Sequence, residues 1–283
     1  MLNGKNKESL RLEILDNLRQ IYIRTFRIMP RLILRYVLGR RGRTAHLSHL
    51  EYDNYWDTFW NKRDIFRMYL PMTKFDKPIS SISPFEFKRL VIVSILEEKL
   101  KQNDITSVLE VGSGAGLNLM LLAPKFPKIS YAGLEPTESG IRISNKFINS
   151  PPPEFEEAYK IGRVENVRVI QGSILDDKLM EKLGNNKFDL VFTCAVLEQL
   201  NNYVDIALDN IFNLTREYFL FYEEWLEANY LVKENYLTLV KSDYFRLSWN
   251  YLNKYRNIEI LERSIPALQP SWLKYGVVFG KKS

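Results

Sequence analysis

The stretch Val108-Leu109-Glu110-Val111-Gly112-Ser113-Gly114-Ala115-Gly116 combines three features in a short space. A β-rich run closes on Glu110 and Val111, glycines follow at alternate positions, and a helical pattern continues over Leu117–Leu122. Glycine tolerates backbone conformations that a side chain forbids, and it lets the backbone come close to a ligand. A strand, a glycine turn and a helix in this order predict a nucleotide-type cofactor lying over the carboxyl ends of parallel strands.

The spacing of these glycines distinguishes between cofactors. The fingerprint of dinucleotide-binding proteins is G-x-G-x-x-G. Counting from Gly112 places its third glycine at position 117, where this chain has Leu117. The observed pattern is E-x-G-x-G-x-G, and it therefore argues against a dinucleotide.

Short β-rich runs alternate with helical patterns downstream of Thr106, which is typical of a parallel sheet wrapped by helices. The first five runs are almost continuously apolar or aromatic, so we expect these strands to be covered on both faces. The predicted strands are Ser107–Val111, Ser130–Leu134, Val167–Gln171, Leu190–Thr193, Tyr218–Tyr222, Ile258–Glu262 and Tyr275–Gly280.

A helix is predicted directly before the first strand. Ser83-Pro84-Phe85-Glu86 offers an N-cap serine, a proline at the first helical position and a glutamate that completes a capping box. The expected apolar stripe of this helix consists of Phe87, Leu90, Val91, Ser94, Ile95 and Leu100.

The glycine turn resembles the first motif of the class I S-adenosylmethionine-dependent methyltransferases, and the resemblance extends over residues 80–283. It implies that Glu110, Gly112, Ser113, Gly114 and Gly116 form the loop that holds the amino-acid end of S-adenosylmethionine. The implied fold is α/β: a Rossmann-like, doubly wound, mostly parallel seven-stranded sheet with an antiparallel C-terminal strand pair. We expect this domain to span 81–283, after a basic helical extension or lid at 1–80.

Further strand ends match the same family. Glu135, followed by Pro136, closes the second strand, where a carboxylate accepts hydrogen bonds from both ribose hydroxyls. The family usually contacts adenine after the third strand, which here assigns Gly172, Ser173 and Ile174, although many members have Asp at the position of Ser173. The resemblance also assigns Thr193 and Cys194, at the end of the fourth-strand motif, to the cofactor site. The nearby Val-Leu-Glu-Gln resembles a common Val-Leu-Glu-His motif with Gln199 in place of histidine.

Candidate catalytic residues follow the fourth and fifth strands, because ligands bind outside the carboxyl ends of strands. We predict Glu198 and Glu223 as catalytic residues, and we place the acceptor against residues from these strand ends and from the N-terminal segment. The predicted acceptor-binding residues are His46, Tyr55, Trp56, Gln199, Glu224 and Trp225. Each has a structural alternative: the carboxylates could cap a helix or face water, the histidine could be structural, and the aromatic residues could pack in a core.

The methyl group of the cofactor is already activated on a sulfonium, so the protein mainly aligns a nucleophile and excludes water. The fourth strand lacks the Asn/Asp-Pro-Pro-Tyr/Phe signature of amino methylation, which argues against a nucleic-acid base or a glutamine as acceptor. The single cysteine and two histidines exclude an intrachain disulfide and leave too few ligands for structural zinc. We therefore predict O-methylation of a small molecule, such as a bacterial metabolite, a sugar or a lipid-linked intermediate. A protein or RNA methyltransferase and a catalytically silent scaffold remain the alternatives.

The net charge of +6 is concentrated near the N-terminus. Residues 1–43 carry eleven Lys/Arg and three Asp/Glu, a balance of +8, which leaves 29 basic and 31 acidic residues in 44–283. Arg24, Arg27, Arg31 and Arg35 fall at helical spacing. Residues 9–39 are expected to be helical, with Pro30 breaking or kinking the run. This segment could pack on the domain, lie on an anionic membrane surface through residues 9–43, or grip a phosphate-bearing ligand. With no signal peptide and no membrane-spanning run in the sequence, the predicted location is the cytoplasm, with the inner membrane surface as a peripheral site.

Overall fold

The computed structural model describes residues 84–151, 159–200, 203–229, 248–266 and 275–283, together with Asn54, Pro153 and Glu156. Three of the predicted acceptor-binding residues, His46, Tyr55 and Trp56, lie outside the described residues. The same holds for the predicted helical run over 9–39 and for the N-cap at Ser83. The division of the chain near residue 80 therefore stays a prediction.

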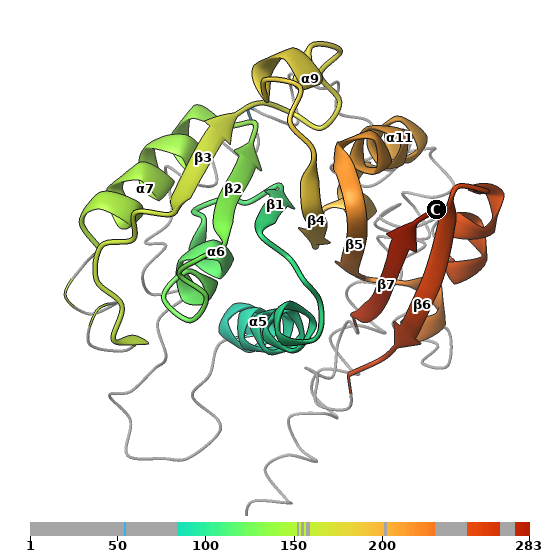
Figure 1. Cartoon of the computed structure of the whole chain (residues 1–283), viewed down its shortest axis with the longest axis horizontal. Coiled ribbons are helices and arrows are strands. Elements are labelled where there is room, and N and C mark those ends of the chain that lie inside the picture. Colours follow the sequence, from blue (N-terminus) through green and yellow to red (C-terminus); the bar gives the residue numbers. More distant parts are fainter. Residues whose placement is uncertain are drawn as a thin grey trace, which may run out of the picture.

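A seven-stranded sheet with the order β3-β2-β1-β4-β5-β7-β6 forms the centre of the domain (Figure 1). Every neighbouring pair from β3 to β5 is parallel, whereas β7 runs antiparallel to both β5 and β6. The strands are β1 (Ser107–Val111), β2 (Ser130–Glu135), β3 (Val167–Gln171), β4 (Phe188–Cys194), β5 (Thr215–Glu223), β6 (Ile258–Ser264) and β7 (Gly276–Lys282). The predicted fold class is confirmed, and several strands extend beyond their predicted ends by a few residues.

Helices cover both faces of the sheet (Figure 1). One face is covered by α5 (Pro84–Gln102), α6 (Leu117–Leu122) and α7 (Glu138–Asn149), which contribute to one apolar cluster. The other is covered by α9 (Leu179–Lys182), α10 (Leu197–Leu200) and α11 (Val204–Leu214), which contribute to a second. The short helices α12 (Leu226–Asn229) and η3 (Trp249–Lys254) also belong to the C-terminal half.

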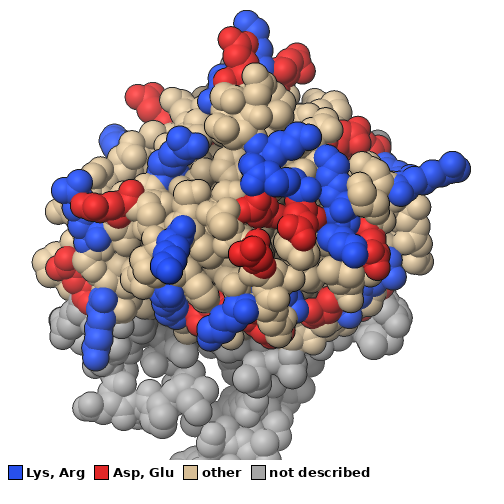
Figure 2. Space-filling model, viewed as in Figure 1, with Lys and Arg blue, Asp and Glu red and all other residues tan. Residues whose placement is uncertain are grey.

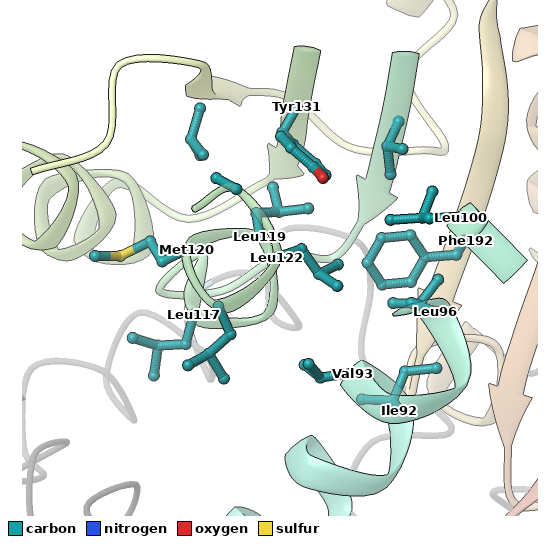
Figure 3. Close-up of a cluster of buried hydrophobic side chains, with 14 of the residues drawn as sticks. Ile92, Val93, Leu96, Leu100, Leu117, Leu119, Met120, Leu122, Tyr131 and Phe192 are labelled. Carbon is teal, nitrogen blue, oxygen red and sulfur yellow. The ribbon is translucent and has the colours of Figure 1, made fainter. Parts of the chain in front are cut away.

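The buried residues of the central strands alternate between these clusters. Val108 packs with the first cluster and Leu109 with the second, because successive strand residues point to opposite faces of a sheet. Figure 3 shows the first cluster, in which Leu96 and Leu100 of α5 lie beside Phe192 of β4. A strand buried on both faces needs apolar residues at every position, which explains the continuous apolar runs of β1 and β4.

Two expectations from the sequence were wrong in detail. The buried stripe of α5 consists of Ile92, Val93, Leu96 and Leu100, whereas Leu90 is 41% exposed and Ser94 is also exposed. Residues 90–96 are apolar around almost the whole helix, so their periodicity does not select one face. In addition, β3 has only its first residue buried, because it is an edge strand with a single neighbour, β2.

The described helices include none that is both long and apolar enough to cross a membrane. Lys and Arg side chains are interspersed with Asp and Glu over the face of the domain in Figure 2.

Candidate functional site

The carboxyl ends of the five parallel strands lie at one edge of the sheet. The order in which successive strands are added to the sheet changes direction next to β1. From β1 the chain moves outward to β2 and β3, then returns to place β4 on the other side of β1. Such a switch point creates a crevice at the strand ends, where ligands bind in open α/β sheets. The glycine turn follows β1 directly and therefore lies at this crevice.

The glycine turn has a backbone that requires glycine. Gly112, Gly114 and Gly116 have φ values of +69°, +54° and +72°, in the left-handed region that residues with a Cβ seldom adopt. A Cβ on Gly112 would lie 2.6 Å from Cγ2 of Val196, in the turn after β4. The N–H groups of Gly112 and Ser113 donate to the carbonyl of Leu134, at 2.8 and 3.1 Å. The turn is thus fixed to β2 and packed against the end of β4.

Glu110 is a buried carboxyl at the base of the glycine turn. Its Oε1 accepts a hydrogen bond from Nδ2 of Asn118 at 2.6 Å, while its Oε2 is buried with no partner among the described residues. Burial raises the pKa of Glu110 to about 8, the hydrogen bond from Asn118 lowers it, and the nearby Glu135 raises it further. A buried acceptor without a donor is energetically unfavourable, so this oxygen suits a donor or a cation supplied by a ligand.

Glu135 connects the end of β2 to the glycine turn. Its Oε2 accepts from the N–H of Gly114 at 2.9 Å, and its Oε1 accepts from the N–H of Thr137 at 3.1 Å and from the Thr137 hydroxyl. A Cβ on Gly140 would lie 2.7 Å from this carboxylate. The carboxylate is therefore held tightly between the turn and the start of α7.

A cavity of about 680 Å³ lies next to this carboxylate, at the ends of β2 and β3. Three residues that the sequence predicts at the cofactor site, Pro136, Gly172 and Ser173, line this cavity together. Ile174 instead buries its side chain in the second apolar cluster. The cavity is also lined by Gln171, Leu175, Asp176, Asp177 and Lys182. Leu175, Asp176, Asp177 and Lys182 were not predicted from the sequence, although the acidic pair Asp176-Asp177 shortly after a strand end could have indicated the cavity.

The turn after β4 is strained and held by side chains. Ala195 has a φ of +60°, which is unusual for a residue with a Cβ. Its N–H donates to the carbonyl of Tyr222 at 3.0 Å, and the side-chain amide of Gln199 donates to its carbonyl. Thr193 and Cys194 lie directly before it; Thr193 is fully buried and Cys194 is half-buried. Gln199 thus stabilises the turn that faces Gly112.

Glu223, at the end of β5, also holds this turn. Its Oε2 accepts from the N–H groups of Val196 and Leu197 at 2.9 and 3.1 Å, and the side chain is fully buried. A carboxylate at this place satisfies backbone donors at the start of α10. The alternative that Glu223 faces water is therefore excluded, and its contacts are those of a helix cap.

Glu198 and Glu224 form a buried cluster with Tyr275. The Tyr275 hydroxyl lies 2.8 Å from Oε1 of Glu224 and 3.3 Å from Oε1 of Glu198, and the N–H of Glu224 donates to Oε2 of Glu198 at 3.1 Å. All three side chains are at least nine-tenths buried. Burial, followed by the two carboxylates, raises the pKa of Tyr275 well above its usual value, so the hydroxyl stays protonated.

Tyr275 was not predicted as a site residue from the sequence. The signal was its position directly before β7, because β7 runs antiparallel to β5 and therefore begins at the edge where β5 ends. Trp225 follows Glu224 but is fully buried in the second apolar cluster, 6.5 Å from the ring of Phe221. Its placement matches the core-packing alternative.

Comparison with known proteins identifies the fold. Residues 109–217 match the family model described as a methyltransferase domain. The chain is similar to the magnesium protoporphyrin IX methyltransferase of Synechocystis PCC 6803 with bound S-adenosylhomocysteine, with 11% identity over 83% of this chain and 100% of that one and a TM-score of 0.58. The plantazolicin methyltransferase BpumL, in complex with a triazolic desmethylPZN analog and S-adenosylhomocysteine, has 11% identity over 83% of this chain and 97% of that one and a TM-score of 0.50. No curated protein matches in sequence.

Proposed function

We propose that this chain, which its methyltransferase domain at residues 109–217 places among the S-adenosylmethionine-dependent methyltransferases, methylates an oxygen atom of a small-molecule acceptor. The observation that carries the proposal is the pair of groups at the switch point of the sheet. One is a glycine turn with a buried, partnerless carboxylate oxygen on Glu110. The other is the buried cluster of Glu198, Glu224 and Tyr275 at the ends of β4, β5 and β7.

The residues at the glycine turn and around Glu110 fit S-adenosylmethionine. The turn over Gly112–Gly116 and Glu110 would hold the amino-acid end, where the unpartnered Oε2 can accept from the ammonium group. Glu135 would hold the ribose, and the cavity lined by Pro136, Gly172 and Ser173 is next to it and of suitable size for adenine. Bound there, the cofactor supplies a methyl group on a positively charged sulfur.

We assign Glu198 as the group that accepts the proton of the acceptor hydroxyl. A base is useful for an oxygen nucleophile because methylation leaves the oxygen with a proton to lose. The Tyr275 hydroxyl and the N–H of Glu224 both lie within hydrogen-bonding distance of this carboxylate and fix its orientation. Glu223 takes a positioning role, because it holds the first residues of the short helix that carries Glu198.

The kind of acceptor is inferred from sequence and from likeness. The sequence lacks the amino-methylation signature after β4, and the two similar structures are of enzymes named for a porphyrin and for plantazolicin. Gln199 and Glu224 follow the same strand ends and are proposed, with His46, Tyr55 and Trp56, to surround the acceptor. Trp225 is not included, because it is fully buried in the second apolar cluster. A metabolite, a sugar or a lipid-linked intermediate is the class to be screened first.

A calorimetric titration with S-adenosylmethionine tests the cofactor assignment. We expect micromolar binding by the wild type and none by Gly114→Arg, because this glycine has a positive φ and its N–H donates to Glu135. Gly162→Arg is the matched control, since Gly162 is exposed and its φ is not positive. Equal binding by both variants, or no binding by folded wild type, contradicts the assignment. With binding established, turnover of a protein or RNA instead of small molecules would contradict the proposed acceptor class.

The basic N-terminal segment supports a second proposal, about location. We propose a cytoplasmic protein whose residues 9–43 contact the anionic inner membrane surface through Arg24, Arg27, Arg31 and Arg35. Each basic residue near such a surface contributes about 1 kcal/mol of attraction. Flotation with vesicles containing anionic lipid should therefore recover the full chain, and replacing the four arginines with glutamine should abolish recovery. Equal flotation of both forms contradicts the proposal.

A further inference from the structure

Two buried carboxyl groups lie at the ends of the neighbouring strands β1 and β2. Glu110 is 2% exposed and Glu135 is 4% exposed, and they are close enough for the charge of Glu135 to act on Glu110. Two carboxyl groups that interact in a buried site resist being ionised together. The question is which of the two carries a proton when the protein is free.

The hydrogen bonds around the two groups differ. Glu135 accepts from two backbone N–H groups, those of Gly114 and Thr137, and from the Thr137 hydroxyl. Several donors to a carboxylate stabilise its ionised form. Among the described residues, Glu110 accepts one hydrogen bond, from Asn118, and its second oxygen has no partner. The proton therefore belongs on Glu110, and the negative charge belongs on Glu135.

The elements packed around Glu110 provide no compensating positive charge within the described part of the chain. The neighbour of Glu110 on β2 is Glu135, which is negatively charged. Its neighbour on α6 is Asn118, whose side chain is neutral. From β4 the partner in register is Phe192, with the thiol of Cys194 two positions further along the strand. A ligand that brings a positive charge to this place would change the balance.

We propose that Glu110 carries a proton in the free protein and releases it to solvent when S-adenosylmethionine binds, so that binding of the cofactor is coupled to proton release. The inference rests on the proposed cofactor. S-adenosylmethionine carries two positive groups, an ammonium and a sulfonium, and only one carboxylate of its own, so it binds as a cation. In the balanced step, the neutral Glu110 carboxyl loses one proton to water and becomes a carboxylate, and the ligand remains a cation paired with it.

The number of protons released on binding follows from the pKa of Glu110 in the free protein. With a pKa of about 8 for Glu110, about 0.9 of the molecules carry the proton at pH 7. Binding at pH 7 should then release about 0.9 protons for each cofactor, provided that the bound form titrates far below neutrality. The same linkage makes the association constant rise about eightfold between pH 6.5 and 7.5, and level off above pH 9.

Calorimetry in buffers of different ionisation enthalpy measures the released protons directly. At pH 7 we expect the slope of the binding enthalpy against buffer enthalpy to differ by about 0.9 protons between wild type and Glu110→Gln. Glutamine keeps the shape of the protonated carboxyl and an oxygen for Asn118, but it has no proton to release. Glu165→Gln, at an exposed glutamate outside the site, should behave as the wild type does.

The comparison with Glu110→Gln also removes the titration of the ligand's own amino group, since both proteins bind the same ligand. A wild-type slope equal to that of Glu110→Gln overturns the proton coupling, even if the cofactor binds tightly. In that case the released proton would come from another group, such as Glu135 or the ligand's own ammonium group. Failure of the wild type to bind in every buffer refutes the cofactor assignment itself and is distinguished by the absence of any binding heat.

Discussion

Replacing Gly112 with alanine should damage both the stability of this protein and its binding of S-adenosylmethionine. Two separate penalties arise from the added Cβ. The first is the left-handed backbone, since Gly112 has a φ of +69° and a residue with a Cβ loses about 1–2 kcal/mol there. The second is a collision, because the new Cβ would lie 2.6 Å from Cγ2 and 3.4 Å from Cγ1 of Val196.

Gly184→Ala separates these two penalties. Gly184 has a φ of +65°, so it carries the same backbone penalty, but its Cβ would meet only the side-chain amide of Asn186, at 3.3 Å. That amide can move by a few tenths of an ångström, whereas a β-branched side chain has one strongly preferred rotamer and yields less readily. We expect a loss of about 1–2 kcal/mol in the free energy of unfolding for Gly184→Ala. For Gly112→Ala, overpacking adds about 1–3 kcal/mol to that loss.

Urea unfolding and calorimetric titration test this prediction together. We expect Gly112→Ala to weaken the binding of S-adenosylmethionine at least tenfold, because the collision separates the glycine turn from the end of β4, whereas Gly184→Ala should bind as the wild type does. In the double variant Gly112→Ala/Val196→Ala, the colliding methyl groups are gone, so about 1–3 kcal/mol of the combined loss should be recovered as coupling. Equal losses for the two glycine variants, or strictly additive losses in the double variant, would refute the reasoning.

Three further substitutions test other parts of the site and the sheet. Burial raises the pKa of Asp189, but hydrogen bonds from neighbouring donors outweigh burial and hold the pKa below its usual value. The ionised carboxylate therefore stabilises the fold above the pKa that Asp189 has in the unfolded chain, and this stabilisation is lost as the pH falls through its pKa in the folded protein. Asp189→Asn should therefore lower the free energy of unfolding by about 1–3 kcal/mol at pH 7 and by less in acid, and a pH-independent loss contradicts this. Tyr275→Phe removes the donor shared by Glu198 and Glu224, so unfolding should become easier by about 1–3 kcal/mol with unchanged cofactor affinity; a large change in affinity would show that the cluster acts on the cofactor end. Glu223→Ala leaves the capped N–H groups buried and should lower stability by about 1–3 kcal/mol in a urea titration, whereas a stable protein would show that water replaces the cap.

The sequence predicted the sheet and the glycine turn because both depend on local information. A glycine pattern such as that of Gly112, Gly114 and Gly116 reflects the conformation of the backbone at those positions. An apolar run reflects burial on two faces. The face of α5 was not predictable in this way, because residues 90–96 are apolar on nearly every side and only the position of α6 and the sheet selects the buried stripe. The edge position of β3 likewise depends on strand order, which no residue within β3 specifies.

The cofactor end and the acceptor end of the proposed site also differ in how far apart in the sequence their interacting groups lie. At the cofactor end, Asn118 is eight residues from Glu110, and Gly114 is 21 residues from Glu135, so one strand-turn-helix unit and the next strand contain the groups that interact. At the acceptor end, Tyr275 lies 77 residues from Glu198 and 51 from Glu224. These groups meet only because β7 inserts antiparallel beside β5 and begins where β5 ends. A short motif can therefore indicate the cofactor, whereas the groups that we propose at the acceptor end are brought together by the order of the C-terminal strands.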